Sequence, residues 1–544
     1  MWAKNRLLFP IFFLTLRQNI NLVAMVRYPI GIQTFSEIRS RNCLYVDKTQ
    51  YVYELANDMK YVFLSRPRRF GKSLLTSTFD AYFSGRKELF KGLAIEKLET
   101  EWTEYPVLHF SLATAKRGTV QDLDDIITMQ LEDAESKYGI QQSETNLTKR
   151  FTRLVKDIYA KTNAQVVVLI DEYDAPMLTV LHDNERLEQM RTELQSFYSP
   201  LKDLDPYLRF VFITGITKFS QLSIFSQLNN LSNISMDPEY SALVGFTQEE
   251  LERDFKEGIQ GIADNNELTY SEALEKLKSL YDGYHFSYKS DGVYNPFSIL
   301  QAMRTSHLDN YWFATGTPSF LVKMMKKFKT NVTQIDGSKV PATEFDAPTE
   351  NMRSILPLFY QSGYITIKDY DPRSYRYTLG YPNEEVKVGL MDMLIPFFVS
   401  PDTIETSNAC WYISEAFLDD DVDKALSAAR SFFAGIPYQE GTLKDAPQSE
   451  GHFTAMLYVM FSFLNRYVYS QVRSGKGRLD ILVETQKSVY VMELKMDGSV
   501  DEALQQIDDK GYAIPYEADG RRIVKVGINF SSKERTIKEW KVRA

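Results

Sequence analysis

The chain has 544 residues, of which 44% are hydrophobic and 25% are charged. These proportions are typical of a folded globular protein and exclude disordered or collagen-like chains, and the length suffices for about three to five domains. The net charge of −9 argues against a protein that coats nucleic acid through its overall charge, but leaves a local basic groove open. Two distant cysteines, Cys43 and Cys410, exclude a disulfide framework and fit a reducing cytosol.

The first 26 residues are expected to be an extension that is unstructured or lies outside the native protein, with Met25 as the true start. Their apolar stretch, 7–16, holds a proline and is too short for a helix to cross about 30 Å of hydrocarbon. Two basic residues precede it, as in a signal sequence, but no small-residue cleavage site follows. We therefore expect no membrane segment and a cytoplasmic location.

Four predicted strands alternate with helices in the first half of the chain. The apolar runs are 61–65, 107–111, 166–170 and 208–214. The helical stretches between them are 119–136, 146–160 and 184–199. The run at 166–170 is rich in β-branched residues throughout, which is typical of a strand buried on both faces. Strands that alternate with helices predict a parallel α/β sheet.

The pattern becomes helical in the middle of the chain. Thr247 and Glu250 form a capping box at the start of a helix, and helical periodicity continues to about residue 335. Residues 350–400 predict a helix, two strands and a second helix, which is a winged-helix-like arrangement. Trp312 and Phe313 are expected to be core residues. Basic residues of the winged-helix-like region either pack on the lid, which we favour, or contact DNA; they are Lys368, Arg373, Arg376 and Lys387.

A phosphate-binding loop is predicted between the strand at 61–65 and the helix that follows it. The sequence there is SRPRRFGKSLL, which holds Gly71, Lys72 and Ser73. Because N–H groups at a helix N-terminus bind phosphate oxygens, Lys72 would reach the β- and γ-phosphates of ATP, and the Ser73 hydroxyl would hold Mg²⁺. The pattern GxxxxGKS has glycine where this chain has Arg66. The incomplete motif alone leaves an ordinary loop as the alternative.

Acidic residues at the end of the 166–170 strand supply the partner motif of a P-loop ATPase. Asp171 would bind Mg²⁺ through water, and Glu172 would orient or deprotonate the attacking water. By themselves these residues could be a solvated strand end. The two motifs occur in the order that an ATPase requires, which favours the functional interpretation.

Four further residues are candidates for contact with the nucleotide. Thr214 ends the next strand and Lys218 follows it, and both are predicted either to sense the γ-phosphate or to be plain turn residues. Arg68 and Arg69 either face the phosphates or form a solvated basic turn.

The motifs along the first 400 residues resemble a known family. They are YPIGIQTFSEIR, LYVDKT, FLSRPRRFGKSLL, VVVLIDEYDAP, FITGITKFS and YDGYHF with VYNPFSIL, followed by YWFATGTPSFL and LFYQSGYITI. Together they resemble the bacterial AAA-ATPase-like family, whose members often carry a PD-(D/E)XK-type nuclease at the C-terminus. The resemblance implies ATP binding and a P-loop fold of the oligomeric or signalling kind, which leaves a homo-oligomer open. An arginine-rich loop without the first glycine is itself typical of this family.

A pair of carboxylates and a lysine mark the last hundred residues. Two β runs meet at a predicted two-residue turn, Gln486 and Lys487. That turn places Asp480 opposite Glu493, with Cβ atoms about 4.5–5.5 Å apart, and puts Lys495 on the same face. Opposed like charges are destabilising unless a cation lies between them, and oxygen ligands favour Mg²⁺ or Mn²⁺. A register slip of one residue would move the first carboxylate to the other face.

The chemistry expected of these residues is phosphodiester cleavage. A metal held by the two carboxylates would polarise the phosphate and activate a water, while Lys495 would orient that water or offset negative charge. The array resembles the PD-(D/E)XK nuclease fold, in which Glu450, at the start of a helix, would complete the metal shell. Gln505 and Gln506 lie on the following helix, where that superfamily often has a glutamine. The alternative is an edge hairpin with scattered charges.

We therefore predict an α/β protein with a P-loop NTPase parallel-sheet domain, a helical lid, a winged-helix-like region and a restriction-endonuclease-like α/β domain. The predicted boundaries are 1–26 for the extension, 27–246 for the ATPase core, 247–335 for the lid, 336–410 for the winged-helix-like region, 411–437 for a helical connector and 438–544 for the nuclease domain. ATP binding or hydrolysis would gate Mg²⁺-dependent cleavage of nucleic acid, with DNA favoured. The alternatives are a signalling NTPase whose C-terminal domain binds nucleic acid or protein without cleaving it, and a scaffold that binds nucleotide structurally.

Overall fold

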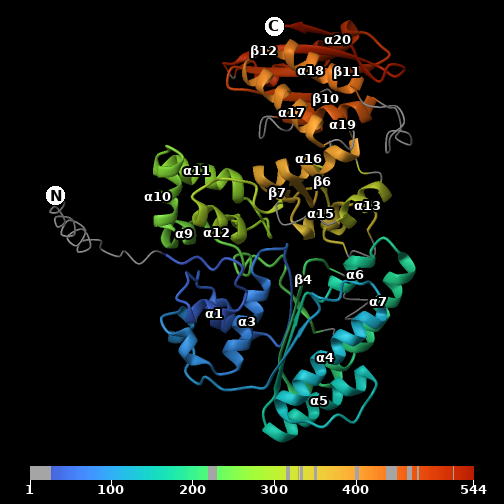
Figure 1. The fold of residues 1–544 in the computed structure, drawn as a ribbon. Helices are drawn as coiled ribbons and strands as arrows, with labels where there is room; N and C mark the ends of the chain where they lie inside the picture. The colour runs from blue at the N-terminus through green and yellow to red at the C-terminus, as the bar shows by residue number, and fades with distance from the viewer. Residues whose placement is uncertain are drawn as a thin grey trace, which may run out of the picture.

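The computed structural model has two sheets at opposite ends of the molecule, with the helices of residues 248–398 between them (Figure 1). The described residues are 26–218, 230–313, 319–328, 330, 335–347, 352–398, 403–435, 450–461, 468–474, 477–518 and 520–544. The predicted N-terminal extension lies outside them except for its last residue. Among the described residues, no helix combines the length and the apolar character needed to cross a bilayer.

The first sheet has five parallel strands in the order β2-β3-β4-β1-β5. They are β1 (Tyr61–Ser65), β2 (Val107–Ser111), β3 (Val166–Asp171), β4 (Leu208–Gly215) and β5 (Ser232–Asn233). The four predicted strands are confirmed, whereas β5 is too short to give an apolar run. Because all the strands are parallel, the loop after β1 and the acidic end of β3 lie at the same edge, with β4 between them.

Helices flank this sheet, as its buried strands require. They are α1 (Phe35–Ser40), α2 (Thr49–Asp58), α3 (Lys72–Phe83), α4 (Val120–Tyr138), α5 (Leu147–Thr162), α6 (Ala175–Val180), α7 (Asn184–Tyr198) and α8 (Pro200–Asp203). The three predicted helices correspond to α4, α5 and α7 and are confirmed. The predicted run at 166–170 is buried along its whole length, which explains its unbroken apolar sequence.

Four helices form the lid and have an apolar core of their own. They are α9 (Gln248–Asp254), α10 (Lys256–Asn265), α11 (Tyr270–Tyr281) and α12 (Pro296–Thr305). The predicted capping box of Thr247 and Glu250 is confirmed, and a second box begins α11. Asn295 caps α12, whose first residue is proline, so the sequence fixes where that helix starts.

The winged-helix-like region contains a small antiparallel sheet in the order β6-β8-β7. It is preceded by α13 (Ser319–Lys327), and its elements are β6 (Ser338–Val340), α14 (Ala342–Phe345), α15 (Leu356–Ser362), β7 (Thr366–Asp371), β8 (Arg376–Gly380) and α16 (Glu384–Phe398). The predicted succession of helix, two strands and helix is confirmed, and β6 adds a third strand. The corner before β7 packs on the phosphate loop: Gly363 has φ of 87°, and a Cβ there would lie 2.7 Å from Cβ of Pro67.

The second sheet has the order β13-β12-β11-β10-β9. Its elements are α19 (Glu450–Phe461), β9 (Val468–Ser474), β10 (Gly477–Glu484), β11 (Ser488–Met496), α20 (Val500–Lys510), β12 (Arg522–Ser531) and β13 (Thr536–Arg543). Strands β11 and β12 are parallel and are joined through α20, whereas the other pairs are antiparallel.

The predicted connector belongs with this second sheet. It comprises the second half of α17 (Thr403–Leu418) and all of α18 (Val422–Gly435). The Trp540 indole N–H of β13 donates to Asp423 at 2.7 Å, and the Thr536 hydroxyl donates to the Arg430 carbonyl oxygen at 2.9 Å. The connector helices therefore cover the C-terminal sheet in addition to linking it to the winged-helix-like region.

Candidate functional site

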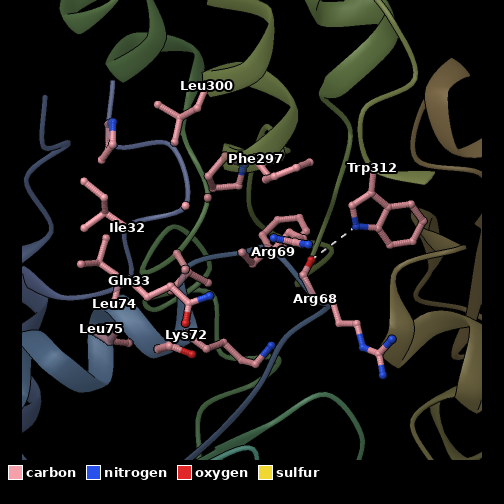
Figure 2. A pocket seen from close by; sticks show the side chains of 18 of the residues that line it. Ile32, Gln33, Arg68, Arg69, Lys72, Leu74, Leu75, Phe297, Leu300 and Trp312 are labelled. Carbon is pink, nitrogen blue, oxygen red and sulfur yellow. Dashed lines mark hydrogen bonds between the residues drawn. The ribbon is translucent and has the colours of Figure 1, made fainter. Parts of the chain in front are cut away.

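A cavity of about 680 Å³ lies between the phosphate loop, the lid and the first described residues (Figure 2). Its lining comes from loop residues 68–75, the segment 29–33, Phe297 and Leu300 of α12, and Trp312. The volume lies in the range of cavities that bind small ligands and cofactors, about 300–1,000 Å³. The cavity opens at the carboxyl end of β1, where ligands bind in open parallel sheets.

The two sides of this cavity differ in polarity. Figure 2 shows the apolar side chains of Ile32, Leu74 and Leu300 on one side, and the cationic side chains of Arg68 and Lys72 on the other. An apolar side next to cationic side chains suits a ligand that has both an aromatic base and phosphate groups.

The phosphate loop turns into α3 at Gly71. Its φ of 90° lies in the left-handed region that favours glycine, so this motif residue has a backbone role. Ser73 lies in the first turn of α3 and lines the cavity, where N–H groups at the helix start bind phosphate oxygens. The loop therefore leads from β1 into the start of a helix, as predicted, and its binding of phosphates stays a prediction.

Lys72 is buried at the centre of the loop. Its ammonium donates to the carbonyl oxygens of Arg66 and Pro67, each at 3.0 Å. Burial lowers the pKa of Lys72, and the charges of Asp171 and Glu172 oppose that change. The loop's own carbonyl groups thus hold the ammonium beside the acidic end of β3.

Arg66 occupies the position where the motif has glycine, and its side chain is only 1% exposed. Its guanidinium donates to the carbonyl oxygens of Ser235 at 2.7 Å and Tyr240 at 3.2 Å, and lies 4.0 Å from the centroid of the Phe286 ring. Burial lowers its pKa to about 10, so it stays charged at neutral pH. The missing glycine is thus replaced by a buried arginine that anchors the start of the loop.

The acidic residues of β3 lie close to Lys72. Asp171 is buried at the end of the strand and accepts the N–H of Glu172 at 2.9 Å. Glu172 lines the cavity with φ of 51°, and burial raises its pKa while the charge of Lys72 opposes that rise. The positions suit the predicted roles, which are Mg²⁺ binding for Asp171 and water activation for Glu172. Both roles stay predictions.

Asp174 is a residue that the sequence patterns missed. It is fully buried and accepts the backbone N–H of Ile216 at 3.1 Å, the N–H of Thr217 at 2.6 Å and the Thr217 hydroxyl. Gly215 leaves room for this contact, because a Cβ there would overlap the Asp174 carboxylate. Asp174 therefore joins the acidic end of β3 to the end of β4. Its only signal in the sequence is a third acid directly after the apolar strand.

Thr214 and Lys218 do not line the cavity in this structure. Thr214 is fully buried, and its hydroxyl donates to the Leu64 carbonyl oxygen of β1 at 2.9 Å. The Lys218 ammonium pairs with Asp346, which follows α14. In this structure the polar atoms of these two residues contact the sheet and the winged-helix-like region, and their contact with a γ-phosphate stays a prediction.

Arg68 and Arg69 are exposed and both line the cavity. The Arg68 carbonyl oxygen accepts the indole N–H of Trp312 at 3.5 Å. The Arg69 guanidinium lies 4.5 Å from the centroid of the Phe297 ring in the lid. Their side chains are thus placed at the cavity, and contact with phosphates stays a prediction.

The predicted register of the C-terminal hairpin is confirmed. The N–H of Thr485 donates to the carbonyl oxygen of Ser488 at 2.8 Å and closes the expected two-residue turn. The β10–β11 ladder continues from there without a slip to Ile481 and Met492, and the next position in this register pairs Asp480 with Glu493. The Asp480 carboxylate also accepts the N–H of Leu494 at 2.9 Å.

Glu493 and Lys495 are linked by a helix glutamine. Glu493 is 2% exposed, and burial, followed by the charge of Asp480, raises its pKa to about 8 against the opposing charge of Lys495. The Lys495 ammonium lies 3.5 Å from Glu493 Oε1 and donates to Gln506 Oε1 at 2.8 Å. The Gln506 amide in turn donates to Glu493. Of the two predicted glutamines, Gln505 is exposed and does not share these contacts.

The residues present fit a divalent cation. Glu493 Oε2 is buried and has no hydrogen-bond partner within the described chain. A cation between Asp480 and Glu493 would satisfy that atom and offset the repulsion of two facing carboxylates. The described residues contain no group of three or more His, Cys, Asp or Glu suited to a metal. Glu450 begins α19, but its side chain is not among those that the structure describes, so its role as a metal ligand stays a prediction.

These two sites define the class of protein: a P-loop ATPase-type region joined to a nuclease-type region. The sequence matches the predicted AAA-ATPase family over residues 29–225 and the PD-(D/E)XK nuclease superfamily over residues 448–540. The chain belongs to these two families in its N-terminal and C-terminal parts, respectively. It is 33% identical over 520 residues to an uncharacterised protein of the vnfD 5′ region in Azotobacter chroococcum mcd 1, covering 94% of this chain and 98% of that one.

A similarity to a solved structure is slight. The ORC2 protein of Aeropyrum pernix, determined in ADPNP and ADP complexes, aligns with a TM-score of 0.22 and 12% identity. The alignment covers 62% of this chain and 87% of that one. This likeness is too weak to inform the assignment.

Proposed function

We propose that the chain is an ATPase joined to a Mg²⁺-dependent nuclease, in which ATP binding or hydrolysis gates phosphodiester cleavage. DNA is the favoured substrate. The N-terminal cavity would take ATP, and the C-terminal hairpin would hold Mg²⁺ or Mn²⁺. A cytosolic location fits the two cysteines, both of which are free thiols.

At the nucleotide site, the apolar side of the cavity would receive the base. Lys72 would turn from the loop carbonyl oxygens to the β- and γ-phosphates, and Arg68 would offset their charge from the rim. Ser73 and Asp171 would hold the Mg²⁺ that accompanies ATP. Glu172 would accept the proton of the attacking water, a role that its cavity position and raised pKa support.

At the hairpin, Asp480 and Glu493 would hold the cation between two strands. When bound, Mg²⁺ would polarise the phosphate and lower the pKa of a water. Lys495 would orient that water or offset the charge that develops on the phosphate, and Gln506 would keep its ammonium in place.

The observation that carries this proposal is the buried Oε2 of Glu493, which lacks a partner among the described residues and faces Asp480. A hairpin that bound only protein would gain nothing from a buried carboxylate oxygen left without a partner. A cation site explains both the unpartnered atom and the facing carboxylates.

The test is a cleavage assay on the purified full chain, with Mg²⁺ or EDTA, with and without ATP. Glu172→Gln, which should bind ATP without hydrolysing it, separates ATP binding from turnover. We expect DNA cleavage that needs Mg²⁺ and that ATP changes. ATP turnover without cleavage of DNA or RNA would instead favour a signalling ATPase with a non-cleaving binding domain. Nucleotide binding without turnover would favour a structural scaffold.

A further inference from the structure

Trp312 contacts the phosphate loop inside the cavity. Its indole N–H donates to the carbonyl oxygen of Arg68 at 3.5 Å, as the dashed line in Figure 2 shows. Its ring also packs on Tyr364, with 5.1 Å between ring centroids. All three residues line the cavity, so a ligand that shifts the loop at Arg68 also acts on Trp312.

A buried carboxylate holds the backbone of Trp312. Glu385, in the first turn of α16, is fully buried. It accepts the Trp312 N–H at 2.8 Å and the Ser298 hydroxyl at 2.8 Å. Burying a carboxylate is costly even when it is hydrogen-bonded, and an apolar residue of similar size would pack without that cost. The acid therefore indicates a positioning role for Glu385.

Helix α16 contacts the same segment again one turn later. Gly389 packs against Phe313, and a Cβ at Gly389 would overlap the Phe313 ring. Because Glu385 and Gly389 are four residues apart, they lie on one face of the helix. α16 is therefore held to residues 312–313 at two successive turns.

The other end of this connection is the C-terminal sheet. α16 packs against α19, and α19 packs against β9, β10 and β11. Two of those strands, β10 and β11, carry Asp480 and Glu493. Chains of packed side chains, hydrogen bonds and rigid helices can carry energetic coupling between distant sites, and α16 and α19 form such a chain here.

We propose that Glu385 is a positioning residue that couples the two sites. Through Trp312 it sets the phosphate loop at Arg68, and through α16 it carries the state of that loop to α19 and the carboxylate hairpin. This inference rests on the proposed function and names the elements through which ATP would gate cleavage.

The experiment compares variants of the full chain for DNA cleavage with Mg²⁺, with and without ATP, and for KM and kcat of ATP hydrolysis. In the wild type we expect ATP to change the cleavage rate by at least about fivefold, the lower end of allosteric coupling. Glu385→Leu removes the acceptor for the Trp312 N–H. It should raise KM for ATP more than it alters kcat and reduce the effect of ATP on cleavage to less than about twofold, with ATP-free cleavage unchanged.

Two matched variants separate coupling from loss of stability. Glu385→Gln keeps an acceptor for the Trp312 N–H and should restore the ATP effect. Ser298→Ala removes a different partner of Glu385 and should also retain the ATP effect. If Glu385→Leu does not fold, Trp312→Phe is measured instead, because it keeps an aromatic ring but loses the indole N–H and part of the ring volume.

The outcomes are distinguishable. A folded Glu385→Leu or Trp312→Phe variant with wild-type ATP dependence would overturn the inference and leave the proposed function standing. A wild type that binds ATP and cleaves DNA, but without any effect of ATP, would overturn both the coupling and the gating while preserving the two activities. A wild type that neither binds ATP nor cleaves would refute the proposed function itself.

Discussion

The ammonium of Lys72 donates to the carbonyl oxygen of Arg66 at 3.0 Å. The ammonium that would contact the phosphates is therefore hydrogen-bonded to the phosphate loop itself. Binding of ATP must exchange these carbonyl contacts for phosphate oxygens. The stronger, charge-assisted partners favour that exchange.

The first prediction concerns this lysine. Lys72→Ala should weaken ATP binding by at least about tenfold, because a charged hydrogen bond contributes about 1.5–3 kcal/mol. Isothermal titration with ATP and Mg²⁺ measures the change. Lys97→Ala, at an exposed lysine of the same region, is the control. Equal affinity of Lys72→Ala and the wild type would mean that the loop is not an ATP site.

The second prediction concerns the metal. Asp480→Asn keeps an acceptor for the Leu494 N–H but removes one of the facing charges. Stabilisation by Mn²⁺, about 2.7 kcal/mol for the intact site at a hundred times its Kd, should be largely lost. Thermal melting with and without Mn²⁺ measures this, in a Lys72→Ala background that silences the ATP site. Asp509→Asn, on the exposed side of α20, should keep the full shift; an equal shift in Asp480→Asn contradicts the site.

The third prediction separates the two neighbouring glutamines. Gln506→Ala should lower the cleavage rate by roughly 10–100-fold, the usual effect of losing a group that orients a metal ligand. Gln505→Ala should leave the rate unchanged, because Gln505 is exposed and donates to Asp509. The measurement is the initial rate of DNA cleavage by each variant at saturating Mg²⁺. Similar rates in the two variants would show that the bridge between Lys495 and Glu493 is not needed.

The fourth prediction is a pH dependence of stability. Burial raises the pKa of Glu385 to about 7, above its ordinary value of 4.5. A raised carboxyl pKa means that the folded chain binds the proton of Glu385 more tightly than the unfolded chain does. The free energy of unfolding therefore falls as pH rises from about 4.5 to 7, and the contribution of Glu385 is constant above that range. The loss is on the order of 3 kcal/mol. Glu385→Gln has no such titration, so it should gain stability relative to the wild type between pH 5 and pH 8. Thermal melting at several pH values measures this difference. If the Tm of the wild type and that of Glu385→Gln change equally with pH, the raised pKa of Glu385 is contradicted.

The fifth prediction compares two arginines of the phosphate loop. Arg66→Gly restores the usual motif but removes buried contacts, so it should destabilise the chain by about 2–4 kcal/mol. Arg69 has φ of 69°, so Arg69→Gly relieves an unfavourable backbone conformation and should change stability by less than about 1 kcal/mol. Urea unfolding compares the two variants. A stable Arg66→Gly protein would mean that the buried guanidinium is dispensable.

Local patterns were sufficient to predict the two sheets' key strands and the carboxylate pair. The run at 166–170 is apolar at every position because both faces of β3 are buried. The position opposite Asp480 followed from one turn, since a two-residue turn fixes the pairing of every residue along the ladder. Both features depend on residues that are close together in the sequence, so they can be predicted without knowing the fold.

Features that depend on distant partners could not be predicted. Arg66 seemed a defect in the motif because its partners, Ser235 and Tyr240, come from another part of the chain. Thr214 lies at the end of a strand, as a phosphate sensor would, but only the sheet order shows that its hydroxyl meets Leu64 of β1. Likewise, nothing near Glu385 in the sequence indicates its bond to Trp312.

The contact between Gly363 and Pro67 has a consequence for how such chains can evolve. A side chain at Gly363 would meet the ring of Pro67, so the turn before β7 and the phosphate loop have complementary shapes. Recombination that joined this ATPase core to a different partner region would need to bring a glycine to the same place. The two regions are therefore expected to be inherited together, while insertions and exchanges accumulate elsewhere.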